Sequence, residues 1–370
     1  MRIGLNAHLL SGRAGYRTAG IHGYIDGLLR HLPAALPNDE LIAFVGAANT
    51  MQIDGLTMRR STLDTEEPIT RIVWEQAVQP FALGHLDLYH ALAFVAPVAL
   101  MIPSVVTIYD LSFIHYPELL PEARRLYLRL FTGLTCARAR RVIAISHSTA
   151  DDLTKTLRVP ADKIDVAAPG YDPAVFRPLP AEQIADFRRK KQLPDRFWLF
   201  IGTLEPRKNL PVLIEAYASL PESERPPLIV GGGKGWDYES IFQTAMRHHL
   251  EDHVQFIGFI PPEDLAIWYN CAEVFVYPSV FEGFGLPVLE AMACGTPVIV
   301  SDASSLPEVA GDAGLCIPPH DVEAWAVALR RAWGDDQWRE QARARGLAQA
   351  ERYTWALTAQ QTADSYRKAL

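Results

Sequence analysis

The chain is 370 residues long, and because a single hydrophobic core rarely extends past roughly 250 to 300 residues, we expect two domains. Hydrophobic residues make up 49% of the sequence and charged residues 21%, a globular composition that excludes wholesale disorder and a fibre. The formal net charge of −8 argues against a dedicated nucleic-acid-binding protein, which would carry a basic domain.

The cysteines indicate a reducing compartment. They are Cys136, Cys271, Cys294 and Cys316. They lie far apart, without a Cys-x-x-Cys pair or histidines at metal-binding spacing, so we predict neither a zinc site nor a disulfide framework. A cytoplasmic location fits this pattern, and the first residues show no secretory leader.

Short apolar runs alternate with longer segments of helical period along the whole chain, which is typical of parallel sheets with crossover helices. In the first half these runs are residues 2–7, 41–46, 87–92, 105–111, 141–146 and 164–168. In the second half they are residues 197–203, 227–232, 254–259, 274–279, 297–301 and 314–318. We therefore predict an α/β protein with two doubly wound, Rossmann-like domains that face an interdomain cleft, where ligands of such sheets bind.

The predicted domains are residues 1–180 and 195–350, joined by a proline-rich and then charged linker around 175–195. A helix at 351–370 is expected to pack back on the first domain. Residues 91–109 carry no charge and are long enough to span a bilayer, but Pro97 and Pro103 favour two buried strands joined by a turn.

Gly20 opens a helix whose apolar face includes Ile25 and Leu28. Because glycine has no side chain, Gly20 is a candidate for close approach of the backbone to a phosphate. An ordinary helix start explains the same residues.

Residues 124–141 combine arginines with an apolar stripe. The arginines are Arg124, Arg125, Arg129, Arg138, Arg140 and Arg141. Such a basic amphipathic segment predicts peripheral contact with an anionic membrane, whereas a solvated helix covering the first domain is the simpler alternative.

Arg207 and Lys208 follow the first predicted strand of the second half. A planar guanidinium and a mobile ammonium at the carboxyl end of a strand suit a diphosphate, because they stabilise the charge that develops on it as it departs. Two solvated loop charges are the alternative.

Residues 274–295 predict a strand, a glycine loop and a helix. The loop and first helical residue are Gly283, Phe284, Gly285 and Leu286, which together form an anion site at a helix N-terminus. Glu282 and Glu290, eight positions apart, bracket this site and suit sugar hydroxyls, since carboxylates accept hydrogen bonds. Alternatively, one acid favours the helix dipole and the other is solvated.

In this order the motifs resemble the GT-B glycosyltransferases of family 4, which are retaining enzymes that use nucleotide sugars. Residues 282–290 resemble the family's Glu-x7-Glu motif, residues 204–209 its donor-phosphate loop, and residues 19–21 its amino-terminal glycine loop. Residues 107–112, 145–148 and 300–302 also resemble stretches of members that assemble bacterial polysaccharides.

The resemblance implies that Glu282 contacts the transferred sugar and Glu290 the ribose, while Lys208 and Arg207 bind the diphosphate and Gly20 binds the phosphates from the other domain. It places the base near Phe259 and Ile260. Where many members have His before Asp, this sequence has Tyr109 and Asp110, which we include in the predicted donor site with tyrosine replacing the histidine. Thr203 stands where some members carry an arginine, so Arg207 supplies that charge.

The activity that the resemblance implies is a retaining transfer of a hexose, with mannose from GDP-mannose as the predicted donor and a glycan or lipid-linked acceptor. UDP-sugars remain alternative donors. No Asp-x-Asp motif is present, so we expect neither a metal ion nor another cofactor. A nucleotide-sugar 2-epimerase and an inactive scaffold that binds sugar nucleotides or glycans are the alternative functions.

Overall fold

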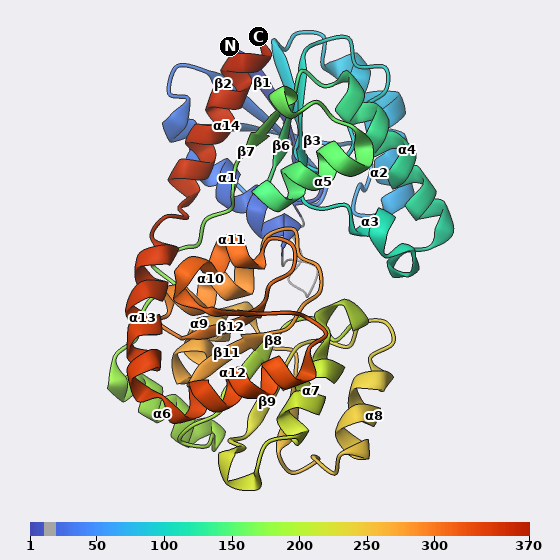
Figure 1. Cartoon of the computed structure of the whole chain (residues 1–370). Helices are drawn as coiled ribbons and strands as arrows, with labels where there is room; N and C mark the ends of the chain where they lie inside the picture. Colours follow the sequence, from blue (N-terminus) through green and yellow to red (C-terminus); the bar gives the residue numbers. More distant parts are fainter. Residues whose placement is uncertain (11–19) are drawn as a thin grey trace. The chain divides into compact units, whose positions relative to one another are not determined.

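The computed structural model describes residues 1–10 and 20–370, which divide into two compact units (Figure 1). Unit 1 combines Met1–Gly170 with Thr354–Leu370, and unit 2 is Tyr171–Tyr353. Each unit contains one parallel sheet with helices packed against it. The two Rossmann-like domains predicted from the alternating pattern are therefore present.

The sheet of unit 1 has the strand order β3-β2-β1-β4-β5-β6-β7. Its strands are β1 (Arg2–Asn6), β2 (Glu40–Val45), β3 (Leu56–Arg60), β4 (Leu88–Ala91), β5 (Ser104–Ile108), β6 (Arg141–Ala144) and β7 (Ile164–Val166). Every predicted run contains a strand, and β4 and β5 confirm two strands within the apolar stretch 88–111. Strand β3 was not predicted, because it is a half-exposed edge strand that ends in Arg59 and Arg60 and lacks the apolar run of a buried strand.

The helices of unit 1 are α1 (Ile21–Ala35), α2 (Pro68–Val73), α3 (Ser112–His115), α4 (Glu122–Arg138), α5 (His147–Leu157) and α14 (Trp355–Ala369). A π-helix, η2 (Trp74–Val78), continues α2, and 3₁₀ turns lie at η3 (Gln79–Ala82), η4 (Pro117–Leu119) and η5 (Ala161–Lys163). In the described part of the chain, no helix combines the length and apolar character needed to cross a bilayer.

Helix α14 packs on α1 and completes unit 1, although it comes from the end of the chain. The Trp355 ring lies against Gly27, where even a Cβ atom would come within 2.3 Å of it. The buried Tyr366 hydroxyl lies 2.7 Å from Nδ1 of His90 on β4. Gly170 packs against the backbone of Thr354 and Trp355, so the two ends of unit 1 that lead to unit 2 lie side by side.

The sheet of unit 2 has the strand order β10-β9-β8-β11-β12-β13. Its strands are β8 (Trp198–Ile201), β9 (Leu228–Gly231), β10 (Val254–Gly258), β11 (Val274–Tyr277), β12 (Val298–Ser301) and β13 (Leu315–Ile317). Strands β8, β9, β11 and β12 are buried along their whole length, which explains their uninterrupted apolar sequences.

The helices of unit 2 are α6 (Ala181–Lys191), α7 (Leu210–Ala218), α8 (Glu239–Arg247), α9 (Pro262–Cys271), α10 (Leu286–Ala293), α11 (Leu306–Ala310), α12 (Val322–Gly334) and α13 (Asp336–Ala350). Its 3₁₀ turns are η6 (Pro206–Lys208), η7 (Glu222–Glu224) and η8 (Gly311–Ala313).

The boundary between the units differs from the predicted one near residue 180. The expected linker contains α6, which packs on α9 within unit 2. The Phe187 and Trp268 ring centroids are 5.6 Å apart, and Arg188 donates a hydrogen bond to the carbonyl of Cys271 at 2.6 Å. The charged stretch is therefore the exposed side of helix α6 and not a linker. The chain first passes from unit 1 to unit 2 at residues 170–171.

In both sheets the strand order reverses beside the first strand. The chain of unit 1 builds outward from β1 through β2 and β3 and then returns to β4 on the other side of β1. Unit 2 repeats this arrangement around β8, with β11 on the returning side. Ligands of open α/β sheets bind at the carboxyl ends of the strands beside such a reversal, which in unit 2 is where β8 and β11 end.

Candidate active site

The loop after β8 carries Arg207 and Lys208 on the 3₁₀ turn η6, which is fixed to the neighbouring strand end. Asn209 adopts a left-handed backbone with φ of 57°, and its side-chain amide donates to the carbonyls of Pro278 at 3.2 Å and Pro319 at 2.6 Å. The amide of Val280 donates to the Arg207 carbonyl at 2.9 Å. The two cations are therefore held at the end of β11 rather than left on a free loop.

Lys208 is buried, with 6% of the residue exposed, and its ammonium lies between two partners. It donates to Oε1 of Glu282 at 2.6 Å and to the Tyr277 hydroxyl at 2.7 Å. Burial lowers the pKa of Lys208, and the facing Glu282 carboxylate opposes this shift. The solvated-charge alternative is therefore wrong for Lys208.

Arg207 joins the same carboxylate from its other side. One guanidinium nitrogen lies 3.2 Å from Oε2 of Glu282 and donates to the Phe281 carbonyl at 2.5 Å. The remaining nitrogens donate to Oε1 of Glu205 at 3.1 and 2.7 Å. The guanidinium plane is thereby fixed between two carboxylates.

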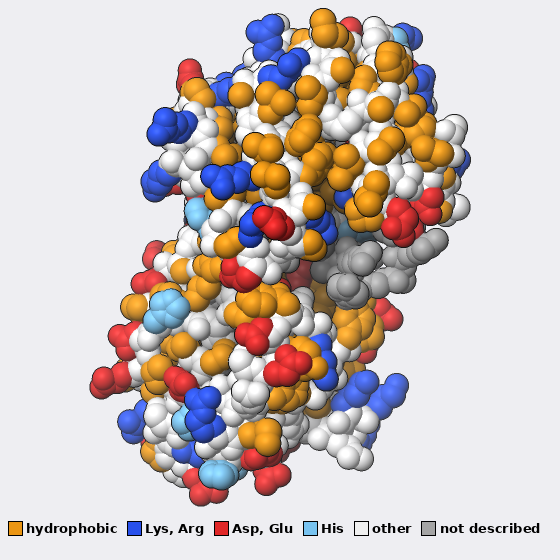
Figure 2. All heavy atoms as spheres, turned by 90° about the vertical axis from the view of Figure 1, so that its right-hand side faces the viewer, with side chains coloured by type: hydrophobic (Ala, Val, Ile, Leu, Met, Phe, Trp, Pro, Cys, Tyr) orange, Lys and Arg blue, Asp and Glu red, His pale blue; other side chains and the backbone are white. Residues whose placement is uncertain are grey.

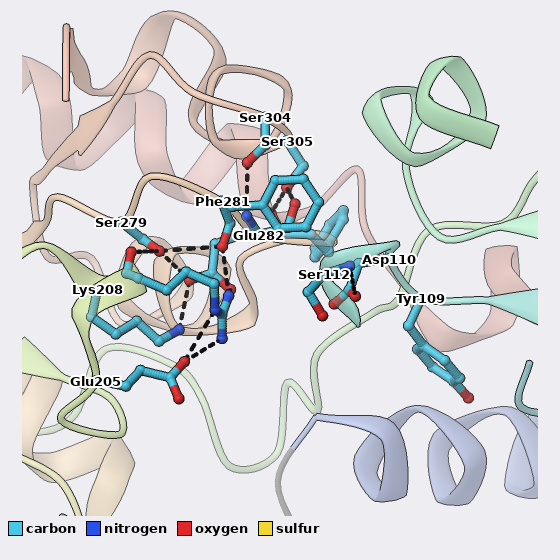
Figure 3. Close-up of polar contacts among 12 residues, drawn as sticks. Tyr109, Asp110, Ser112, Glu205, Lys208, Ser279, Phe281, Glu282, Ser304 and Ser305 are labelled. Atoms are coloured by element: carbon cyan, nitrogen blue, oxygen red, sulfur yellow. Dashed lines mark hydrogen bonds and ion pairs between the residues drawn. The ribbon is translucent and has the colours of Figure 1, made fainter. Parts of the chain in front are cut away.

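Glu282 is the centre of this network (Figure 3). The Ser279 hydroxyl donates to its Oε1 at 2.6 Å, its own amide donates to Oγ of Ser304 at 2.8 Å, and Ser305 donates to its carbonyl at 3.0 Å. Burial alone would raise the pKa of Glu282, but Lys208 and Arg207 lower it to about 2. The carboxylate is therefore ionised at neutral pH.

The glycine loop brings the chain from β11 into α10. Gly285 has φ of 109°, a conformation that favours glycine, and a Cβ atom there would lie 2.7 Å from the Leu306 side chain. Gly283 is buried in the preceding turn, and Leu286 begins the helix. The buried Phe284 ring packs edge-on against Tyr353 at 5.3 Å, so its side chain belongs to the core.

Glu290 lies in α10, one turn past the loop, and has a different environment from Glu282. Its Oε2 accepts a hydrogen bond from the Tyr269 hydroxyl at 3.0 Å. Burial raises the pKa of Glu290 to about 7, although the Tyr269 hydrogen bond acts in the opposite direction. The two acids of the spaced pair therefore differ, since one is ionised over the whole neutral range and the other titrates within it.

The predicted base contacts at the end of β10 divide between surface and core. Phe259 is 52% exposed and follows Gly258, which has φ of 74°. Ile260 is 6% exposed and fills the space beside Gly231, where a Cβ atom would come within 2.4 Å of it. The Phe259 ring is therefore exposed at the end of β10, whereas the Ile260 side chain is a packing residue.

In unit 1, Gly20 precedes α1 with φ of 65°, and no atom of residues 1–10 or 20–370 lies within 4 Å of the position a Cβ would occupy. Phosphate binding at Gly20 stays a prediction, and its neighbour Ala19 lies outside the described residues. Asp110 accepts a hydrogen bond from the Ser112 amide at 2.8 Å.

Tyr109 does not occupy the place expected for it. Its hydroxyl donates to the Leu92 carbonyl at 2.8 Å, and its ring packs edge-on against Tyr24 at 5.3 Å. Figure 3 shows the ring turned away from the Asp110 carboxylate. The side chain is buried in the core of unit 1 and is not presented to a ligand, so the predicted donor contact through Tyr109 is corrected.

Several residues of the network escaped the sequence analysis. They are Glu205, Tyr277, Ser279, Ser304 and Ser305. Ser304 and Ser305 come from the loop after β12, far from Glu282 in the sequence, and their signal was a polar cluster directly after a buried strand. Glu205 lies within the predicted donor-phosphate loop and Ser279 at the end of the predicted run 274–279, but neither position was predicted to contact Glu282 or Arg207.

Comparison with known proteins gives two family matches, one to the second half of the chain and one mainly to unit 1. Residues 182–349 match the model for "Glycosyl transferases group 1", and residues 69–175 match the model for "Glycosyltransferase Family 4".

The chain is also similar to curated mannosyltransferases. The chain is 37% identical over 282 residues to O-antigen chain mannosyltransferase B of Escherichia coli, an alignment that covers 76% of this chain and 74% of that protein. It is 34% identical over 256 residues to the serotype-specific mannosyltransferase WbdA of Escherichia coli, covering 68% of this chain and 31% of that longer protein.

Among solved structures, sucrose-phosphate synthase from Thermosynechococcus elongatus superposes with a TM-score of 0.78 at 24% identity, covering 99% of this chain and 98% of that one. This likeness concerns the fold.

Proposed function

Since the chain belongs to the family 4 glycosyltransferases and is a hexosyltransferase, we propose that it transfers mannose from GDP-mannose to a glycan or lipid-linked acceptor. The observation that carries this proposal is the network of Lys208, Arg207 and Glu282 where β8 and β11 end. The mannosyltransferases to which the chain is similar support mannose as the sugar.

In this proposal the network stabilises the departing nucleoside diphosphate. When the anomeric C–O bond breaks, positive charge develops on the sugar and negative charge on the diphosphate. Lys208 and Arg207 are held in place before the reaction, so they can stabilise that negative charge without reorganising. The ionised Glu282 holds both cations and accepts a hydrogen bond from a hydroxyl of the transferred sugar.

We propose retention by attack from the face that the diphosphate leaves. The acceptor oxygen forms the new bond to the anomeric carbon as the bond to the diphosphate breaks, and the acceptor proton passes to the departing diphosphate oxygen. Glu282 is badly suited to act as a covalent nucleophile, because Lys208 and Ser279 engage its Oε1 and Arg207 engages its Oε2.

Glu290 is proposed to accept hydrogen bonds from the ribose hydroxyls. It lies in the first turns of α10, whose N-terminus favours the diphosphate through its unpaired amides and its dipole. Phe259 is proposed to cover the base with its exposed ring.

The reaction is proposed to need no metal ion or cofactor, because Lys208 and Arg207 supply the positive charge that a divalent cation would otherwise bring to the diphosphate.

A thermal-shift panel of GDP-, UDP-, ADP- and dTDP-sugars, each with and without EDTA, tests the donor. A ligand at a hundred times its Kd stabilises a folded protein by about 2.7 kcal/mol. We expect GDP-mannose to raise the Tm equally with and without EDTA. A larger shift with a UDP-sugar would replace the proposed donor, and a shift abolished by EDTA would contradict metal independence.

Product analysis separates transfer from the alternatives. The similarity to mannosyltransferases favours transfer over a nucleotide-sugar 2-epimerase. Incubation with the donor alone should leave the sugar configuration unchanged, whereas an epimerase would convert it. Donor binding without turnover on any glycan or lipid-linked acceptor would instead support an inactive scaffold.

A further inference from the structure

One side of unit 1 exposes large apolar side chains that a globular core would normally bury. We name this set the apolar face; its residues are Val98, Met101, Leu126, Leu130 and Leu134. Met101 is 91% exposed and Leu130 is 57% exposed. Figure 2 shows hydrophobic side chains gathered over unit 1 on the side that carries α4, with basic side chains among them.

The apolar face is built from α4 and the loop before β5, which meet at Leu134 and Met101. Leu126, Leu130 and Leu134 follow one another at intervals of four residues and therefore share one side of α4. Thr135 of the same helix accepts a hydrogen bond from the Ala96 amide at 3.1 Å, which brings the loop against α4.

The loop is held in this exposed position by its own hydrogen bonds. The Val98 amide donates to the Gln76 side chain on η2 at 2.9 Å, and Arg138 donates to the Leu100 carbonyl at 3.5 Å. Met101 is thus presented to the outside by a loop anchored on both sides. An apolar side chain held in this way gains stability only when something outside the unit covers it.

A cavity of about 240 Å³ opens beside the apolar face and adds charge to it. Val98, Met101 and Leu134 line its apolar side, and Arg138 and Arg140 line it as well. Both arginines are exposed, at the C-terminal end of α4 and just beyond it. The site therefore combines apolar walls with two guanidinium groups, which suit a phosphate.

We infer that unit 1 docks on an anionic phospholipid bilayer through the apolar face, with a lipid phosphate received between Arg138 and Arg140. An anionic phospholipid matches both parts of the site, since its acyl region covers Met101 and Leu130 while its headgroup pairs with the arginines. The chain as a whole carries a net charge of −8, so attraction to an anionic bilayer must come from a local basic site such as this pair of arginines.

The inference deepens the proposed function, because a lipid-linked acceptor lies at a membrane surface. Only the biological role of bilayer binding rests on the proposed function. Bilayer binding can be measured without donor or acceptor. Donor binding, measured separately by thermal shift with GDP-mannose, reports on unit 2, so either result can fail without the other.

The experiment is cosedimentation of the full chain with vesicles of phosphatidylcholine alone and of phosphatidylcholine mixed with phosphatidylglycerol. We expect binding to the mixed vesicles only, weakened by salt. Arg138→Gln with Arg140→Gln should lower the partition coefficient roughly 30-fold, because each arginine near an anionic surface contributes about 1 kcal/mol. Met101→Ser with Leu130→Ser should lower it by at least tenfold through lost apolar contact.

The matched control is Met246→Ser with Arg247→Gln on α8 of unit 2, where Met246 is 60% exposed. It removes an exposed apolar and a basic side chain from another surface and should bind vesicles like the unchanged chain. Equal Tm values show that every variant is folded. Absence of vesicle binding by the unchanged chain, or equal binding by all variants, would overturn the inference, as would a dimer that the Met101 and Leu130 substitutions dissociate.

Discussion

Lys208 and Glu282 form a buried ion pair, so a substitution of either residue also changes the environment of the other. Both are held within a buried network, so removal of one leaves the other without its main partner. The sequence motifs indicated both residues separately and assigned one to the diphosphate and the other to the sugar. They could not show the pairing, because the two residues are 74 positions apart and meet only through the β8–β11 neighbourhood.

We expect Lys208→Ala to lower kcat by roughly two to four orders of magnitude, because it removes a charge that stabilises the departing diphosphate. Mannosyl transfer at saturating donor measures this loss. Lys155→Ala, on an exposed helix of unit 1, is the control and should retain full activity. Activity within threefold of the unchanged enzyme would remove Lys208 from the reaction.

Glu290 predicts a pH dependence of donor binding. Burial raises the pKa of Glu290 to about 7, so the folded protein without donor favours the protonated carboxyl, and stability from this group is lost as pH rises from the ordinary glutamate range through about 7. Ribose hydroxyls donate to the ionised form, so donor affinity should increase as pH rises from 6 to 8.

Titration calorimetry with GDP at both pH values measures this effect for the unchanged enzyme and for Glu290→Gln. The variant has no titrating group at this position and should show a nearly constant Kd. The same pH dependence in both proteins would mean that another group is responsible.

At the scale of elements, the connection from β11 to α10 depends on one backbone conformation. Gly285 provides a positive φ next to the Leu306 side chain, and this geometry sets where the helix N-terminus points. The alternation of glycines before a proline-started helix was enough to predict the connection. The contact with Leu306 was not predictable, since it comes from the following helix α11.

We expect Gly285→Ala to lower the stability of unit 2 by about 1 to 3 kcal/mol and to weaken donor binding, because alanine must adopt a strained φ against Leu306. Urea unfolding and donor titration measure the two effects. Gly133→Ala in α4 is the matched control. Among the described residues, no atom outside the local helix backbone lies within 4 Å of the position a Cβ would occupy, so alanine there should leave stability equal or higher.

The strands were predictable because buried parallel strands have continuous apolar sequences. The exceptions follow from the same reasoning. Strand β3 is an edge strand with a polar end, so it lacks the continuous apolar run of a buried strand. Helix α6 has no buried residue, so it lacks the periodic apolar stripe of a packed helix. Tyr109 was misplaced for a related reason, because a tyrosine in a motif does not reveal whether its ring packs inward.

At the scale of the whole molecule, the sequence predicted two α/β units but not where the chain passes between them. The crossings lie at residues 170–171 and 353–354, so unit 1 contains both ends of the chain. A composition change near residue 180 pointed to the wrong place, since the proline-rich segment and α6 pack within unit 2.

We expect Tyr366→Ala to destabilise unit 1 by about 3 to 5 kcal/mol, because it empties a fully buried site and removes one of the two hydrogen-bond partners of His90. Thermal unfolding should then show unit 1 melting earlier, while the Tm increase caused by GDP in unit 2 is kept. Leu357→Ala on the exposed side of the same helix should change little. A matching decrease in both transitions would show that the units unfold together.

Unit 2 is one continuous stretch of chain, whereas unit 1 is interrupted by it and is finished by α14. A ribosome therefore synthesises every residue of unit 2 before it makes the segment that covers Gly27 and contacts His90. During synthesis the first sheet remains without α14 while unit 2 is being made. Unit 1 is begun first, but it can be completed only after the last residue of unit 2 has been added.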